Sequence, residues 1–447
     1  MSINNTDALA GREPARAWVS SPTQPSFPPS SPALAIEVLE SLRVGDHTFH
    51  TLPVLRAARG FQQILCAGLV REKAAARPTP PNSQIVLIAA NPVAHGARLV
   101  ASVRESIKSS TMSVVTDARL AEEGLEIEYS FPGISGNSLL SFVSRKRLVF
   151  AFKLRSLLPR RTSLIGSTSR LYREYLFIAQ AVRYAACHAA VKQMPPTTIL
   201  LTDFDRHTYC QPWVWAANGI GMTTVTLTHG SPNEANYVPV LARHSLVWGA
   251  VQKEWMEDKS PGVDVQIVGR PDLAGHRFGQ SGTVPRVVLC HSRERLSIDE
   301  TDSLVAHLSN LTKNGHVITL RLHPSATEND LDERWSRVAS MVNDVVVSRD
   351  SFVSSLRSSD LVICIASSSA VEAIAVGVAA VVIADEARTL PGDLEAIRSA
   401  SPAVLREFAA HGDVKTPHLN RLASQILAAT GAPAGHLLDQ ALLKIRA

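Results

Sequence analysis

Short apolar segments alternate with helical segments along most of the chain, and this alternation is the feature that most constrains its fold. Runs such as QIVLIAA at residues 84–90 and DLVICIA at 360–366 predict buried strands, and the apolar residues between such runs have helical spacing. Strands that are apolar throughout are typical of parallel sheets with helices on both faces. The sequence therefore predicts the α/β fold class with parallel sheets.

Stretches rich in proline, glycine and serine divide the alternation into parts. The first 32 residues end in SSPTQPSFPPSSP, which predicts a disordered leader at 1–32. Residues 270–285 contain several Gly and Pro residues and no apolar period, so we place a domain boundary there. The prediction is an N-terminal Rossmann-like domain at 33–270 and a C-terminal one at 271–447, two doubly wound domains that face a cleft.

The composition excludes several classes of protein. A chain of 447 residues with 45% hydrophobic and 19% charged residues is typical of globular proteins of two or more domains. A net charge of +5 is too small to predict nucleic-acid binding. The five cysteines form no CxxC pair, and neither a signal peptide nor a membrane-spanning run stands out. We therefore expect a cytoplasmic protein with reduced thiols.

Polar residues follow two predicted strands of the C-terminal domain. One strand ends in an Arg-Leu-His-Pro segment, and another ends in three serines that open a helix. Ligands of open α/β sheets bind at such strand ends, where cations and helix N–H groups suit phosphate and a carboxylate suits ribose hydroxyls. Each feature alone also fits a strand exit or a helix cap. The predicted nucleotide-binding residues are Arg321, His323, Pro324, Ser367, Ser368, Ser369 and Glu372, with Arg270 at the domain crossing.

These segments resemble a known family. The His-Pro segment and SSSAVEAIAVGVAAVVI resemble the donor-binding domain of GT-B glycosyltransferases that build bacterial surface polysaccharides. Within these enzymes, the polysialyltransferase-like and CDP-glycerol glycerophosphotransferase-like groups are the most similar. THGSPNEANYVPVLARHSLVWG and QIVGRPDL resemble their N-terminal segments, so the resemblance covers residues 197–387. It implies a GT-B fold in which His323, the serines and Glu372 bind a nucleotide donor.

The resemblance implies a glycosyltransferase that moves a sugar from a nucleotide-activated donor to a glycan or lipid-linked acceptor in capsule or other surface polysaccharide biosynthesis. An inverting reaction is expected, with the nucleotide sugar as co-substrate and with no metal or other cofactor. Two enzyme alternatives on the same fold stay open: a CDP-polyol phosphotransferase and a sugar-nucleotide epimerase. A third alternative is a non-catalytic GT-B-like binding subunit.

Such a transfer needs a base that takes the proton of the acceptor hydroxyl. His229 and Asp205 end strands of the N-terminal domain, where we expect them to line the cleft. Glu122 and Glu123 precede Gly124, and this triplet resembles the acidic motif of polysialyltransferase-like enzymes, in which an acidic residue is the base. An ordinary helix end would look the same. The sequence leaves the choice among these residues open.

Residues 144–161, SRKRLVFAFKLRSLLPRR, are the one concentrated basic segment. Arginine and lysine alternate there with leucine, valine and phenylalanine, as in elements that lie on anionic membranes. A solvated helix face or an acceptor-binding loop would have the same composition. A peripheral contact of residues 144–161 with the inner face of the plasma membrane therefore stays open beside these two alternatives.

Overall fold

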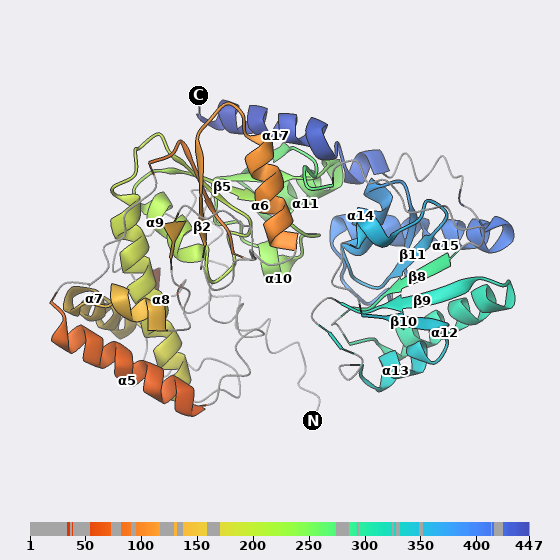
Figure 1. Ribbon diagram of the computed structural model, residues 1–447, viewed down its shortest axis with the longest axis horizontal. Helices are drawn as coiled ribbons and strands as arrows, with labels where there is room; N and C mark the ends of the chain where they lie inside the picture. Colours follow the sequence, from red (N-terminus) through yellow and green to blue (C-terminus); the bar gives the residue numbers. More distant parts are fainter. Residues whose placement is uncertain are drawn as a thin grey trace.

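The computed structural model describes residues 34, 35, 38, 54–72, 82–90, 95–116, 129–131, 137–158, 170–273, 286–292, 295–323, 326–327, 331–347, 352–412, 414 and 423–446. Within these ranges the chain forms two α/β domains, which lie side by side in Figure 1. The leader predicted at 1–32, and also Glu122, Glu123 and Pro324, lie outside the described residues.

Seven parallel strands form the sheet of the N-terminal domain, in the order β3-β2-β1-β4-β5-β6-β7. The strands are β1 (Ile85–Ile88), β2 (Met112–Thr116), β3 (Tyr129–Ser130), β4 (Ile199–Thr202), β5 (Thr223–Leu227), β6 (His244–Val247) and β7 (Asp264–Ile267). The strand order reverses between β1 and β4, which makes the sheet doubly wound.

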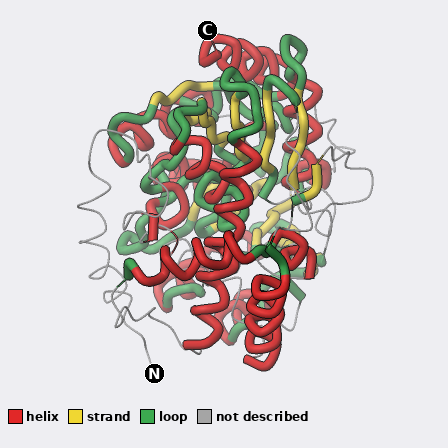
Figure 2. Tube along the Cα trace, turned by 90° about the vertical axis from the view of Figure 1, so that its left-hand side faces the viewer, coloured by secondary structure: helices red, strands yellow, loops and turns green. Residues whose placement is uncertain are grey.

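Helices cover both faces of this sheet. They are α5 (Val54–Val70), α6 (His95–Ser106), η1 (Asn137–Phe142), α7 (Arg145–Ser156), α8 (Arg170–Val191), α9 (Gln211–Gly219), α10 (Glu234–Tyr237) and α11 (Ala250–Lys259). Alternate residues of β1 point to opposite cores: Val86 packs with α8 and α9, and Leu87 packs with α6. Figure 2 shows the strands of this domain between helices.

The C-terminal domain repeats this plan on a smaller scale. Its parallel strands are β8 (Arg286–Cys290), β9 (Val317–Arg321), β10 (Asp344–Val346), β11 (Leu361–Cys364) and β12 (Ala379–Val382), in the order β10-β9-β8-β11-β12. The helices are α12 (Ile298–Lys313), α13 (Glu333–Ala339), η3 (Val353–Ser355), α14 (Ser369–Ala375) and α15 (Gly392–His411). The strand order reverses between β8 and β11, so this sheet is doubly wound too.

The last helix, α17 (Gly431–Arg446), returns to the N-terminal domain (Figure 1). Leu438 and Leu442 are buried in the same core as Val103 of α6, and the Ser109 hydroxyl donates to Asp439 Oδ1 over 2.6 Å. The sequence had assigned this helix to the domain at 271–447. Its apolar period predicts a buried face, but periodicity does not tell which sheet covers that face.

The domains meet through residues that follow β6 and β7. Trp248 directly follows β6 of the N-terminal sheet, yet its side chain is fully buried in the core of the C-terminal domain with Leu273 and Ile426. Its indole Nε1 donates to Thr228 O over 2.8 Å, so the ring is anchored on the side of its own domain. The fold is thus two doubly wound domains in the GT-B arrangement, and the predicted fold class is confirmed.

Gly269 is a point of close approach between this junction and the C-terminal segment. It has φ +76°, and an added Cβ would collide with the backbone of Ala429. The next residue, Arg270, donates its amide to Ala429 O over 2.9 Å. A side chain at position 269 therefore cannot be accommodated without moving the segment that leads into α17.

We expect Gly269→Ala to lower the free energy of unfolding by about 2 to 5 kcal/mol, the sum of left-handed backbone strain and overpacking. Gly221→Ala is the matched control, because Gly221 has φ +79° and open space around its Cβ position. Only strain of about 1 to 2 kcal/mol is expected there. Urea unfolding followed by tryptophan fluorescence measures both. Equal losses in the two variants would contradict a close contact at Gly269.

Candidate functional site

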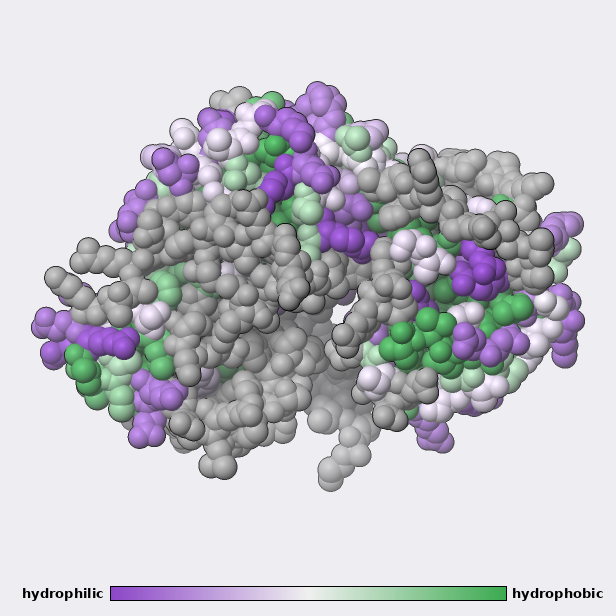
Figure 3. Space-filling model, viewed as in Figure 1, coloured by the Kyte–Doolittle hydropathy of each residue, from purple (hydrophilic) through white to green (hydrophobic). Residues whose placement is uncertain are grey.

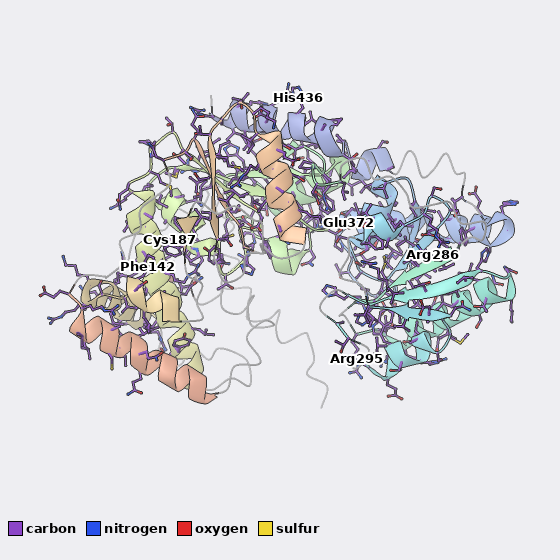
Figure 4. The ribbon with its side chains drawn as sticks, viewed as in Figure 1. Phe142, Cys187, Arg286, Arg295, Glu372 and His436 are labelled. Atoms are coloured by element: carbon purple, nitrogen blue, oxygen red, sulfur yellow. The ribbon has the colours of Figure 1, made fainter. Side chains whose placement is uncertain are left out.

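An ion pair joins the strand ends of the two sheets. Arg270 follows β7, Glu372 lies in the first turn of α14 after β11, and Nη1 of the arginine is 3.7 Å from Oε1 of the glutamate. Both side chains are buried. Figure 4 shows Glu372 on the side of the C-terminal domain that faces the N-terminal domain. Two residues predicted to bind the donor thus come together at the domain junction.

Asp272 and Trp248 hold the Arg270 guanidinium in place. Asp272 accepts two hydrogen bonds, from Nε over 2.7 Å and from Nη2 over 2.5 Å, and the guanidinium carbon lies 4.4 Å from the centroid of the Trp248 ring. Burial lowers the pKa of Arg270, but Asp272 and Glu372 raise it by more, so the net shift is upward. The arginine is therefore a fixed cation.

One donor and one acceptor of the Arg270–Glu372 pair make no hydrogen bond among the described residues. Nη1 of Arg270 and Oε2 of Glu372 are buried and have no hydrogen-bond partner among the described residues. Buried polar atoms are normally hydrogen-bonded, because a buried donor or acceptor without a partner lowers the stability of the folded protein. A ligand that offers hydroxyl groups at the junction would satisfy both.

Three strands of the C-terminal sheet end in polar residues that lie next to one another. β8 lies between β9 and β11, so His291, which follows β8, separates the predicted His323 from the predicted serines. His323 is exposed, and its amide donates to Nδ1 of His291 over a long 3.5 Å. The His291 ring packs edge-on against Trp335, with centroids 4.8 Å apart.

Sequence reasoning missed His291 and its neighbour Ser292. Both are buried at the end of the central strand, where the rule for open α/β sheets would have placed a ligand contact. The signal was present, since a His-Ser pair directly follows the apolar run RVVLC. Both residues join the candidate site.

Arg321 and the three serines already form some hydrogen bonds within the C-terminal domain. Arg321 is buried, and its Nη1 donates to Ser355 Oγ over 3.1 Å. Ser367 accepts from the Ser369 amide over 3.3 Å and donates its hydroxyl to Ser369 Oγ over 3.1 Å. The helix begins there as expected, while its N-cap residue Ser368 makes no side-chain cap. The three serines are half-buried, so ligand atoms can reach them.

His229 is the candidate base at the strand ends of the N-terminal sheet. Its Nδ1 lies 2.8 Å from the Asp203 carbonyl oxygen, and a carbonyl only accepts, so Nδ1 carries the proton and Nε2 has the free lone pair in the neutral ring. Tyr237 Oη lies 3.2 Å from Nδ1, and the Phe204 ring centroid is 4.9 Å away. These contacts set both the tautomer and the position of the ring.

The surroundings of His229 favour its neutral form. Burial lowers its pKa, Asp203 partly offsets this shift, and the charge of Arg270 adds to it, with a net lowering. The residue is nevertheless exposed to solvent. A neutral, accessible imidazole with a fixed tautomer is suited to accept a proton.

Asp205 occupies a different environment from the one expected. It is fully buried, and its Oδ2 accepts hydrogen bonds from the amides of Leu241 over 2.6 Å and Ala242 over 2.9 Å. Burial raises the pKa of its carboxyl group. It therefore supports the loop before β6 instead of lining an open surface. In the part of the chain that the structure describes, no group of three or more His, Cys, Asp or Glu side chains is arranged to hold a metal ion.

Solved structures of several enzymes are similar to this chain. A variant of the O-GlcNAc transferase of Thermobaculum terrenum matches with 12% identity over 92% of this chain and 77% of that one, at a TM-score of 0.43. The UDP-GlcNAc 2-epimerase of Neisseria meningitidis, bound to UDP-GlcNAc, matches with 12% identity over 80% and 99%, at 0.46. A GtfA/B complex matches with 11% identity over 59% of this chain and 61% of that one, at 0.38. No protein-family model and no curated protein matches the sequence.

His207, beside the candidate base, generates a prediction about pH. Burial lowers the pKa of His207 to about 4, and its Nδ1 accepts from the Tyr209 amide over 3.1 Å. The unfolded chain binds this proton near pH 6.5. Between about pH 6.5 and 4 the unfolded state thus carries a proton that the folded state lacks, and stability falls as the pH is lowered.

We expect His207→Gln to reduce this fall, seen as a smaller drop in Tm between neutral pH and about pH 4. His436→Gln, at an exposed histidine of α17, should keep the wild-type slope. If His207→Gln also keeps that slope, His207 is not the group that titrates.

Proposed function

We propose that this chain is a nucleotide-sugar-dependent glycosyltransferase. The observation that carries the proposal is the Arg270–Glu372 contact, which brings the strand ends of both sheets to one junction. One side of that junction offers histidine, serine and arginine side chains, and the other offers a neutral histidine. A two-substrate transfer needs this division between a donor half and an acceptor half.

The donor nucleotide belongs to the C-terminal domain in this proposal. The exposed His323 and the half-buried serines after β11 donate hydrogen bonds to the diphosphate, whose charge Arg321 and Arg270 balance. Glu372 Oε2 and Arg270 Nη1, which have no hydrogen-bond partner among the described residues, bind the ribose hydroxyls. These roles stabilise the diphosphate as it leaves with the electron pair of the broken glycosidic bond.

His229 acts as the base on the acceptor. Its Nε2 takes the hydroxyl proton while the acceptor oxygen forms a bond to the anomeric carbon and the bond to the diphosphate breaks. A single displacement of this kind inverts the configuration of the sugar. Surface polysaccharide synthesis as the pathway, a glycan or lipid-linked acceptor and independence from metal are supported by the family resemblance alone. Epimerase and polyol phosphotransferase activities on the same site are outcomes of the tests.

The donor site predicts nucleotide binding that depends on His323. We expect one of CMP, CDP, UDP, GDP or dTDP to raise Tm by several degrees, since a ligand at about 100 times its Kd adds about 2.7 kcal/mol of stability. His323→Ala should lose this shift, and His436→Ala, at the exposed surface of α17, should retain it. Nucleotide binding without turnover on any acceptor would favour the non-catalytic subunit. If no nucleotide raised Tm, the proposed donor site would be contradicted.

The base assignment predicts a split between binding and turnover. We expect His229→Ala to lower kcat by about 10²- to 10⁴-fold, the usual contribution of a general base, while the nucleotide shift remains. Asp205→Asn should lower Tm, because the carboxylate holds two backbone amides, and should keep kcat within a few-fold. A large loss of kcat in Asp205→Asn at unchanged Tm would move the base to Asp205. Sugar-nucleotide turnover without any acceptor would indicate an epimerase or a hydrolase.

A further inference from the structure

Helix α7 exposes apolar side chains on its solvent face, among cations, in addition to the apolar side chains on its core face. Leu148, Ala151 and Leu154 are buried against the domain. On the other side Val149 and Phe152 are 47% and 43% exposed, and Leu157, just beyond the helix, is 40% exposed. Single exposed apolar side chains are common, but here three share one side of one element.

Apolar side chains are exposed at the end of α5 as well, next to the start of α7. Leu69 and Val70 are 75% and 83% exposed, and the next residue, Arg71, accepts a hydrogen bond from the Arg145 amide over 2.8 Å. The last turn of α5 therefore meets the first turn of α7, and both helices lie at the end of the N-terminal domain far from the C-terminal domain (Figure 1). We call the exposed side chains of Leu69, Val70, Val149, Phe152 and Leu157 the apolar ridge.

Cations flank the apolar ridge. Arg71, Arg145, Lys146 and Lys153 are all exposed, and α7 contains no acidic residue. Two carboxylates of described neighbouring segments are Glu72, which is exposed just past the end of α5, and Glu174, which is paired with Arg155 over 2.7 Å. Figure 3 shows strongly hydrophilic and hydrophobic side chains next to one another at this end of the molecule. The surface combines net positive charge with exposed apolar groups.

We infer that the apolar ridge docks on the surface of an anionic phospholipid bilayer. Side chains such as valine, leucine and phenylalanine enter the boundary between headgroups and acyl chains, while lysine and arginine bind lipid phosphates. A protein partner fits less well, because the centres of protein interfaces are depleted in lysine. Among the described residues no helix is both long and apolar enough to cross a bilayer. The inference deepens the proposed function, since a lipid-linked acceptor would be presented at that surface.

Flotation of the full chain with vesicles tests this directly and needs no nucleotide. The wild type should float with vesicles of phosphatidylglycerol and phosphatidylcholine at low salt, and should stay behind with phosphatidylcholine alone. Lys146→Glu with Lys153→Glu should weaken binding by roughly tenfold or more, because each cation near an anionic surface contributes strongly. Val149→Ser with Phe152→Ser should weaken it as well, and should lower the binding that remains at high salt.

The control is a matched pair on the other domain, Lys313→Glu with Val317→Ser, which changes an exposed cation and an exposed apolar residue far from α7. It should float like the wild type. Failure of the wild type to bind anionic vesicles at low salt would overturn the inference, and so would wild-type flotation of both α7 variants. A dimer that Val149→Ser with Phe152→Ser dissociates would assign the ridge to a second copy and also overturn it. Nucleotide-induced shifts that persist in the α7 variants keep this outcome separate from a failure of the donor site.

Discussion

The candidate site depends on a cation that the fold buries at the crossing between its domains. An unpaired buried guanidinium would cost far more than a domain can offset, so Arg270 must have permanent partners. Asp272 provides two hydrogen bonds, Trp248 provides a ring face, and Glu372 provides a second carboxylate from the other domain. Because this compensation comes from both domains, the same contacts that hold the charge also hold the strand ends of the two sheets together.

Two doubly wound sheets joined in this way divide the chemistry between them. In each sheet the strand order reverses at one place, and the loops there diverge and leave room for a ligand. The N-terminal sheet presents His229, whose tautomer is set by a backbone carbonyl, and the C-terminal sheet presents the loops after β8, β9 and β11. The proposed base and the proposed phosphate ligands therefore follow strand ends of different domains.

Local sequence patterns predicted much of the candidate site. The strand ends predicted Arg270 and Glu372 separately, and the structure brings them to 3.7 Å. His291 follows the central strand without a recognisable motif, so the sequence alone did not single it out. The strand-end rule also placed Asp205 at an open surface, whereas its carboxylate is enclosed by the backbone of residues 241 and 242. A residue three positions past a strand can turn inward or outward, and only packing decides which.

The sequence by itself determined the class of fold, the two-domain division and the polar residues that end the strands. Buried strands and amphipathic helices produce periodic patterns of apolar residues that can be read within a short stretch of sequence. Tertiary structure alone decided which sheet α17 covers, where Trp248 is buried, and that Arg270 pairs with Glu372. It also decided that α7 keeps an apolar side exposed. These features depend on contacts between residues far apart in the chain. The hydrophobic effect is non-directional, so an apolar face is stabilised by any partner of suitable shape, and the sequence does not specify which one.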